Sequence, residues 1–216
     1  MTGEQVDSAL VRRWLSATAD AVVAEREQLT QLDAAIGDGD HGVNMSRGMT
    51  AVREALAGSS PGAPGADLVL AGRTLISKVG GASGPLYGVA LRGAGRCLGE
   101  GACTGPAELA AALRDGLDAI RRLGGAAPGD KTMVDAWLPA VVALEAAVTA
   151  GRPLAEAASA AAAAAEDGMR ATVPLRARKG RASYLGERSE GHQDPGATST
   201  ALLFRALAGV VGEPAG

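Results

Sequence analysis

Three aspartates, Asp33, Asp38 and Asp40, fall within eight residues in the segment LDAAIGDGDHGVNMSRG, residues 32–48. Carboxylates packed this closely repel one another: at about 5 Å, a like pair costs roughly 3 kcal/mol at an effective dielectric constant near 20. A cation among the oxygens removes this cost, and Mg²⁺ and Ca²⁺ prefer oxygen ligands. The spacing therefore predicts a cation site. A capped Asp/Gly turn is the alternative, but such a turn does not need three carboxylates.

The calcium-binding loop of an EF-hand does not fit this segment. With Asp38 at position one, Gly42 falls at position five, and Val43 stands where the loop requires glycine. Met49 stands where the loop requires a bidentate glutamate. An EF-hand is therefore excluded, whereas Mg²⁺, which commonly shares its ligand shell with phosphates, fits the pattern.

His41 and Asn44 follow the aspartates at the expected start of a helix, where unpaired backbone N–H groups favour anions. Asn44 can bind a phosphate oxygen or a metal-bound water. His41 can act as a contact, as a base or as a polar residue at the helix start. A second candidate for phosphate is KVGGASGPLYG, residues 78–88, whose glycines allow close approach of the backbone and whose Ser83 offers a hydroxyl. This segment lacks the GxxxxGK[ST] pattern, so it is not a P-loop, and an ordinary turn is its alternative.

Two further segments carry candidate ligand contacts. In GGAAPGDKTMVDAW, residues 124–137, Met133 can lie against a planar base or in the core, and Asp130 and Lys131 can form a solvated pair. The second segment, residues 174–194, is a long polar loop of the kind that is functional or disordered. It supplies five cations that can bind phosphate or simply form a solvated face: Arg176, Arg178, Lys179, Arg181 and Arg188.

Taken together, the segments describe one site at one end of a bundle. Two Mg²⁺ ions would contribute +4, whereas three carboxylates and a nucleoside diphosphate contribute roughly −6. One or two arginines close most of this gap. The charges suit phosphoryl transfer, in which catalysis is mainly positioning and charge neutralisation.

The elements that position these segments are predicted to be helices. Hydrophobic residues make up 47% of the 216 residues and are mostly Ala, Leu and Val, with five aromatic residues, which favours close helix packing. No segment alternates with the period of a strand. The spacing predicts an all-α antiparallel bundle of about eight helices. They are expected at 6–29, 45–58, 68–79, from 85, from 106, at 134–148 with a kink or local break at Pro139, from 153, and from 195 with Asp194 as N-cap.

The composition also excludes some classes of function. A net charge of −3 gives no global attraction to nucleic acid or acidic membranes. The sequence contains no uncharged apolar stretch of roughly 18 residues, so we expect no transmembrane helix. The first residues lack the apolar core of a signal peptide. Cys97 and Cys103 form no metal-type pair and fit a reducing compartment. We expect a cytoplasmic protein with a single domain over 1–216.

Four motifs, in order along the chain, resemble the nucleotide-binding L subunit of dihydroxyacetone kinase: LDAAIGDGDHGVNMSRG, GGASGPLYG, PGDKTMVDAW and RKGRASYLGERSEGHQDPGATS. The resemblance covers nearly the whole chain and implies an all-helical barrel. It implies that Asp33, Asp38 and Asp40 hold two Mg²⁺ ions that bridge the phosphates of ADP or ATP. It assigns the nucleotide contacts to His41, Gly42, Val43 and Asn44, the phosphate turn Ala82 and Ser83, Gly124 and Met133 around the adenosine, and Arg181, Asp194, Pro195 and Gly196 on the closing side.

The resemblance also implies a division of labour among subunits. A separate K subunit holds dihydroxyacetone, and the L subunit transfers the γ-phosphoryl group of ATP to it. In the phosphotransferase-system form, a phosphohistidine on an M subunit rephosphorylates the ADP in place. No side chain beyond the metal and nucleotide ligands is then required for catalysis. Two alternatives stay open: a subunit of an ATP-dependent dihydroxyacetone or keto-sugar kinase with exchangeable ATP, and a regulatory module that binds partners such as a transcription regulator.

Overall fold

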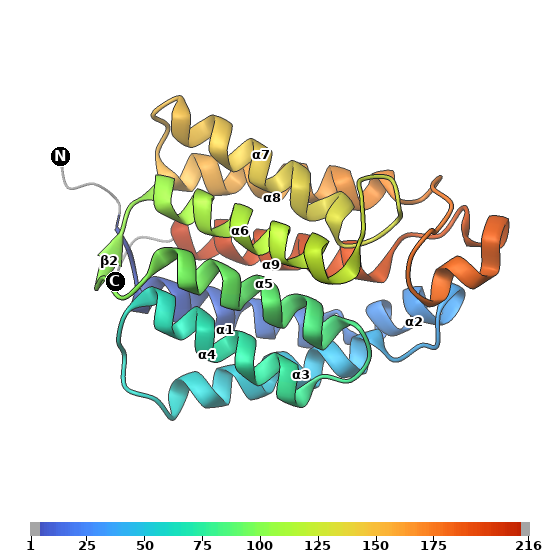
Figure 1. The fold of residues 1–216 in the computed structure, drawn as a ribbon, viewed down its shortest axis with the longest axis horizontal. Helices are drawn as coiled ribbons and strands as arrows, with labels where there is room; N and C mark the ends of the chain where they lie inside the picture. Colours follow the sequence, from blue (N-terminus) through green and yellow to red (C-terminus); the bar gives the residue numbers. More distant parts are fainter. Residues whose placement is uncertain (1–4, 213–216) are drawn as a thin grey trace.

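The computed structural model describes residues 5–212, and its long helices lie side by side along the molecule (Figure 1). Their mutual contacts close eight of them into a ring. Each helix of the ring packs on the next in the order α1, α3, α4, α5, α6, α7, α8, α9, and α9 packs back on α1. The ring consists of α1 (Ser8–Ala24), α3 (His41–Ala57), α4 (Pro64–Lys78), α5 (Ser83–Leu98), α6 (Pro106–Gly124), α7 (Val134–Thr149), α8 (Leu154–Ala171) and α9 (Pro195–Gly212). The all-α prediction is confirmed. The single domain over 1–216 stays a prediction, because residues 1–4 and 213–216 lie outside the described part.

One more α-helix and a 3₁₀-helix lie together at one end of the ring, at the right of Figure 1. They are α2 (Arg26–Ile36) and η1 (Arg181–Ser189). The prediction of one helix over 6–29 is wrong in two respects. The first helix ends before Glu25, and a second helix, α2, continues as far as Ile36, so Asp33 lies on a helix. Val6 belongs to β1 (Val6–Asp7), which pairs antiparallel with β2 (Cys103–Thr104) at the opposite end.

Two predicted irregularities are also corrected. The prediction of a local break at Pro139 is wrong, because α7 runs without interruption from Val134 to Thr149. A proline in the second turn of a helix removes only one backbone hydrogen bond. The predicted polar loop over 174–194 contains η1, so nearly half of it is helical. Among the described residues, no helix is long and apolar enough to cross a membrane.

Side-chain contacts of two kinds hold the ring together. The indole Nε1 of Trp14 on α1 donates to the carbonyl oxygen of Leu203 on α9 at 2.9 Å, which joins the two ends of the chain. Between α4 and α5 the contact is made by glycines instead. A Cβ added at Gly72 would lie 2.5 Å from the carbonyl oxygen of Gly88, and one at Gly95 would lie 2.4 Å from that of Gly65. The backbones of α4 and α5 therefore touch, with no room for a side chain.

This contact predicts opposite effects for two glycine-to-alanine replacements. Alanine normally stabilises a helix interior relative to glycine by about 0.5–1 kcal/mol. We expect this gain for Gly209→Ala on α9, where nothing lies within 4 Å of the added Cβ. Gly95→Ala should instead lower the free energy of unfolding by about 1–3 kcal/mol, because the two backbones must separate. Urea unfolding of both variants tests this, and equal effects would contradict the close contact.

Candidate functional site

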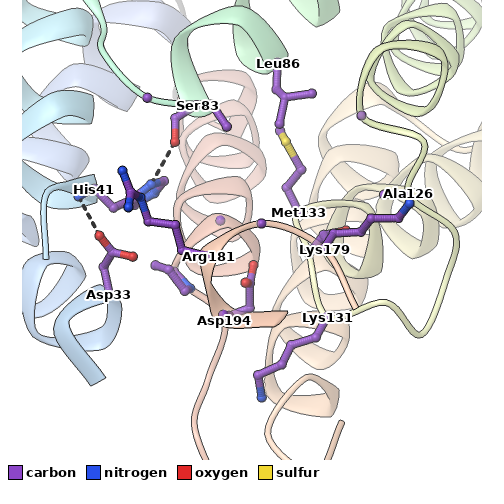
Figure 2. Close-up of a pocket in the computed structure, with 18 of the residues that line it drawn as sticks. Asp33, His41, Ser83, Leu86, Ala126, Lys131, Met133, Lys179, Arg181 and Asp194 are labelled. Atoms are coloured by element: carbon purple, nitrogen blue, oxygen red, sulfur yellow. Dashed lines mark hydrogen bonds between the residues drawn. The ribbon is translucent and has the colours of Figure 1, made fainter. Parts of the chain in front are cut away.

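A cavity of about 460 Å³ opens at the end of the ring that carries α2 and η1. Its walls come from the turn between α2 and α3, the first turns of α5 and α9, the end of α6, the segment before α7, and residues 179–182. Of the fifteen predicted site residues, twelve line it: Asp33, Asp38, Asp40, His41, Ala82, Ser83, Gly124, Met133, Arg181, Asp194, Pro195 and Gly196. Residues from six separate stretches of sequence therefore meet in one pocket, part of which Figure 2 shows.

The acidic cluster is defined by Asp33, Asp38 and Asp40, each of which offers an oxygen within 4.8 Å of the others. Backbone groups fix its shape, since Asp33 Oδ2 accepts hydrogen bonds from the backbone N–H groups of Asp40 at 2.8 Å and His41 at 3.0 Å. The turn needs glycine as well: a Cβ at Gly37 would lie 2.2 Å from Asp33 Oδ1. The start of α3 thus aims its N–H groups at the cluster, which offsets part of the repulsion.

His41 is the start of a buried chain of polar groups behind the acidic cluster. Its Nδ1 lies 3.0 Å from Ser83 Oγ, and its Nε2 lies 2.9 Å from Ser199 Oγ. Ser199 continues the chain to the hydroxyl of Tyr87, at 2.7 Å, and Tyr87 reaches Thr200 Oγ1 at 2.8 Å. Burial lowers the pKa of His41, although Asp33 and Asp40 oppose the shift, and burial raises the pKa of Tyr87. The chain ties α3, α5 and α9 together at the floor of the pocket.

Three predicted contacts, Gly42, Val43 and Asn44, do not line the cavity. Gly42 lies against α2, because a Cβ there would be 2.1 Å from the carbonyl oxygen of Arg26. Val43 is 39% exposed. Asn44 is buried, and its Oδ1 accepts a hydrogen bond from Arg47 Nη2 at 2.7 Å. Gly42 and Asn44 therefore have packing and hydrogen-bonding roles beside the cavity, and a nucleotide contact at any of the three positions stays a prediction.

The far end of the cavity is apolar. Met133, just before α7, and Leu86 lie close together in Figure 2, and Ile120 and Ala126 are further apolar residues that line the cavity. Met133 is buried. Leu86 was missed by the sequence analysis, although it lies three residues after Ser83 and therefore on the same face of α5. An apolar slot joined to a charged rim suits a ligand with a planar base and phosphates.

The closing side carries both signs of charge. Arg181 Nε lies 2.8 Å from Asp38 Oδ2, so this guanidinium reaches the acidic cluster from η1. Lys179 lies beside Ala126 in Figure 2. Asp194 caps α9 as predicted, since its Oδ2 accepts from the backbone N–H of Ala197 at 2.6 Å. Burial raises the pKa of Asp194 to about 7, and the nearby Asp135 adds to the rise.

The interpretation of Asp130 and Lys131 as a solvated pair is wrong, because both are buried. Asp130 Oδ2 accepts from the backbone N–H of Ala127 at 2.8 Å, which shapes the turn before Met133. Lys131 has a φ of 62°, a backbone conformation that favours glycine. Lys131 is among the residues that line the cavity, and in Figure 2 its side chain points away from the other labelled side chains. No local pattern in the sequence separates such a lysine from an exposed one.

The fold and the site define a helical barrel with a pocket at one end that joins an acidic cluster to an apolar slot. Comparisons with known proteins agree with this class. The model of the DAK2 domain matches residues 35–209, so the chain belongs to the DAK2 domain family, and the resemblance drawn from the motifs is confirmed.

Individual relatives extend this finding. The "PEP-dependent dihydroxyacetone kinase, ADP-binding subunit DhaL" of Escherichia coli (strain K12) is 45% identical over 195 residues, which cover 90% of this chain and 93% of the relative. A "D-erythrulose kinase" of Mycolicibacterium smegmatis is 46% identical over 204 residues, 94% of this chain but 35% of the relative. The crystal structure of the dihydroxyacetone kinase from C. freundii in complex with AMP-PNP and Mg²⁺ has a TM-score of 0.72 at 29% identity. The match covers 96% of this chain and 35% of that kinase chain.

The buried carboxyl group of Asp194 predicts a pH-dependent stability. Its pKa is about 7 in the fold against a usual 3.8, so folding disfavours the charged form. The contribution of this group to stability therefore falls as the pH rises from about 4 through 7 and is constant above. Asparagine also caps helices but carries no charge. The free energy of unfolding of Asp194→Asn, taken relative to the unmodified protein, should be at least about 1.4 kcal/mol higher at pH 8 than at pH 5. Urea unfolding of both proteins at the two pH values measures this change.

Asp7→Asn is the matched control, because Asp7 caps α1 by accepting from the backbone N–H of Leu10 at 2.8 Å. It measures what replacing a capping aspartate costs by itself. If the stability difference of Asp194→Asn were the same at pH 5 and pH 8, the burial of a carboxyl group with a raised pKa would be contradicted.

Proposed function

We propose that this chain is the adenine-nucleotide-binding subunit of a dihydroxyacetone kinase. In this role it transfers the γ-phosphoryl group of ATP to dihydroxyacetone held on a partner K subunit. The observation that carries the proposal is the acidic cluster at the rim of a 460 Å³ cavity with an apolar far end. The relative named as an ADP-binding subunit of a dihydroxyacetone kinase, matched over 93% of its own length, supports the same role.

The residues of the acidic cluster fit Mg²⁺. All three offer carboxylate oxygens, the ligands that hard cations prefer, and the three oxygens lie within 4.8 Å of one another. We assign two Mg²⁺ ions to Asp33, Asp38 and Asp40, as the resemblance implies. Bound there, Mg²⁺ would neutralise charge on the phosphate oxygens of the nucleotide.

The chain's own residues then divide the work of binding. The N–H groups at the start of α3 and α5 face the phosphate side, where Ser83 is already oriented by its bond to His41. Arg181 adds a positive charge that reaches the acidic cluster from the closing side. Met133 and Leu86 form the apolar slot that takes the base. His41 orients Ser83 and Ser199, and no proton transfer through His41 is required.

Partners complete the proposed reaction. The K subunit supplies dihydroxyacetone, and a phosphohistidine-bearing M subunit rephosphorylates the bound ADP. The relatives named as ADP-binding subunits of PEP-dependent and PTS-dependent dihydroxyacetone kinases support a kinase of several subunits. We also propose that a transcription regulator docks on this chain in a nucleotide-dependent way. The subunits are proposed to meet in the cytoplasm, without nucleic acid or membrane as a binding partner.

A second candidate function is favoured by the relatives named as erythrulose kinases. This chain covers about a third of each of them, at 46% and 45% identity in Mycolicibacterium smegmatis. An ATP-dependent keto-sugar kinase would use the same pocket but exchange ADP freely. The two candidates therefore differ in how firmly the nucleotide stays bound.

Replacement of one carboxylate tests the metal assignment. Asp38→Ala should abolish the Mg²⁺-dependent part of ADP binding, because the cation loses a ligand and Arg181 loses its partner. Isothermal titration with ADP, in excess Mg²⁺ and in EDTA, measures this part directly. Asp167→Ala removes the same charge from an exposed position outside the cavity and should leave binding unchanged. Unchanged Mg²⁺-dependent binding in Asp38→Ala would rule out the assignment.

The retained nucleotide separates the two candidate functions. The protein is purified, passed through a gel-filtration column and denatured, and the released nucleotide is measured. A stoichiometric amount of ADP indicates a resident cofactor that an M subunit rephosphorylates. An empty protein that binds ATP and ADP reversibly favours the kinase with exchangeable ATP. Phosphorylation of dihydroxyacetone must in either case require an added K subunit, and activity of this chain alone would refute the proposal.

A further inference from the structure

Lys131 is buried in the turn before α7, with 1% of its surface exposed. Among the residues that the structure describes, no carboxylate oxygen lies within 4 Å of its ammonium group, so it forms no ion pair there. Buried lysines without such a partner are rare, because removing an ammonium group from water is costly. Its positive φ of 62° adds strain, so the surrounding structure must hold the residue in place.

Backbone carbonyl oxygens surround the ammonium group instead of carboxylates. Lys131 Nζ donates to Thr172 at 2.8 Å, to Leu175 at 3.1 Å and to Val173 at 3.4 Å, and it also donates to the carbonyl oxygen of His192. The first three oxygens lie just past the end of α8, where helices leave carbonyl groups unpaired. The negative end of a helix dipole also favours a cation there. The fourth oxygen lies three residues before α9.

These contacts enclose the segment that forms the closing side of the pocket. The chain between Leu175 and His192 carries η1, with Lys179 and Arg181 in the cavity wall. Two backbone hydrogen bonds reinforce the closure. Gly191 donates to the carbonyl oxygen of Val173 at 2.8 Å, and Arg178 donates to that of Asp130 at 3.0 Å. Lys131 therefore joins both ends of the segment to one point beside α7.

We propose that Lys131 is a positioning residue that holds segment 172–194 closed and so places Arg181 and Asp194 for the nucleotide. The effect on the nucleotide rests on the proposed function, whereas the effect on the segment does not. Without the ammonium group, the carbonyl oxygens of Leu175 and His192 lose their donor, and opening of the segment lets water replace it. The carbonyl oxygens of Thr172 and Val173 keep backbone donors, from Leu175 and Gly191. Replacing a side chain that only adds to general stability would instead loosen the whole ring.

The test compares two variants by hydrogen exchange and by titration with Mg²⁺ and ADP. Lys131→Met keeps the length of the side chain and the strained backbone but removes the ammonium group. We expect exchange to rise at least tenfold in peptides from 172–193 alone, and affinity for ADP to fall at least tenfold. Leu144→Ala is the control, because Leu144 is fully buried on α7 ten residues beyond Val134 and outside the cavity wall. It should raise exchange across the ring and change affinity less than twofold.

Other outcomes overturn the proposal. Exchange that rises across the ring in Lys131→Met, as in the control, would show a general structural role. Local opening with affinity changed less than twofold would show that the closed segment does not place nucleotide contacts. If the unmodified protein binds no ADP with Mg²⁺, the proposed function fails, while the exchange data still decide whether Lys131 closes the segment.

If Lys131→Met does not fold, the proposal is tested on the unmodified protein instead. Hydrogen exchange is then followed at increasing urea concentrations below the unfolding transition. If Lys131 closes the segment, peptides around 130–132 and peptides from 175–193 should lose protection together, with the same dependence on urea. Loss of protection at different urea concentrations would refute the proposal.

Discussion

The repulsion among three carboxylates is the constraint on which the site end of the barrel depends. Asp33, Asp38 and Asp40 bring oxygens within 4.8 Å of one another, an arrangement that is unfavourable without nearby positive charge. The fold answers it with backbone geometry first: α2 stops at Ile36, the glycine turn reverses the chain, and α3 begins with its N–H groups aimed at Asp33. Arg181 then adds a full charge beside Asp38. The cluster is therefore held in place by the chain itself, as the proposed cation site requires.

A second set of buried charges supports the first from behind the closing segment. Lys131 and Asp194 interact across this region, and the positive charge of Lys131 opposes the rise in the pKa of Asp194 that burial causes. Thr172 connects them physically, because its carbonyl oxygen accepts from Lys131 and its hydroxyl accepts from the backbone N–H of Asp194. The start of α9 and the end of α8 are thus fixed to the same turn. The position of the closing segment follows from backbone hydrogen bonding as much as from its own side chains.

The features that the sequence could predict are those written in local patterns. Amphipathic spacing identified the helices of the ring, and the cap at Asp194 was read correctly from residue type alone. The break at Glu25 was not predictable, because helix-forming residues continue through it and no glycine or proline marks the end of α1. The burial of Lys131 was hidden for a related reason. Its partners are carbonyl oxygens 41 to 61 residues away, and backbone groups leave no signature in sequence.

The topology explains why the pocket lies where it does. In a ring of antiparallel helices, alternate helices begin at the same end, so α3, α5, α7 and α9 all start beside the cavity. Four helix N-termini, each with the positive end of a helix dipole, therefore converge there, which favours an anionic ligand. Helices α4, α6 and α8 end at the same place, and their carbonyl groups need cations or donors. Lys131 supplies such a cation at the end of α8. The same alternating arrangement of helices therefore explains both the attraction for an anionic ligand and the buried ammonium group.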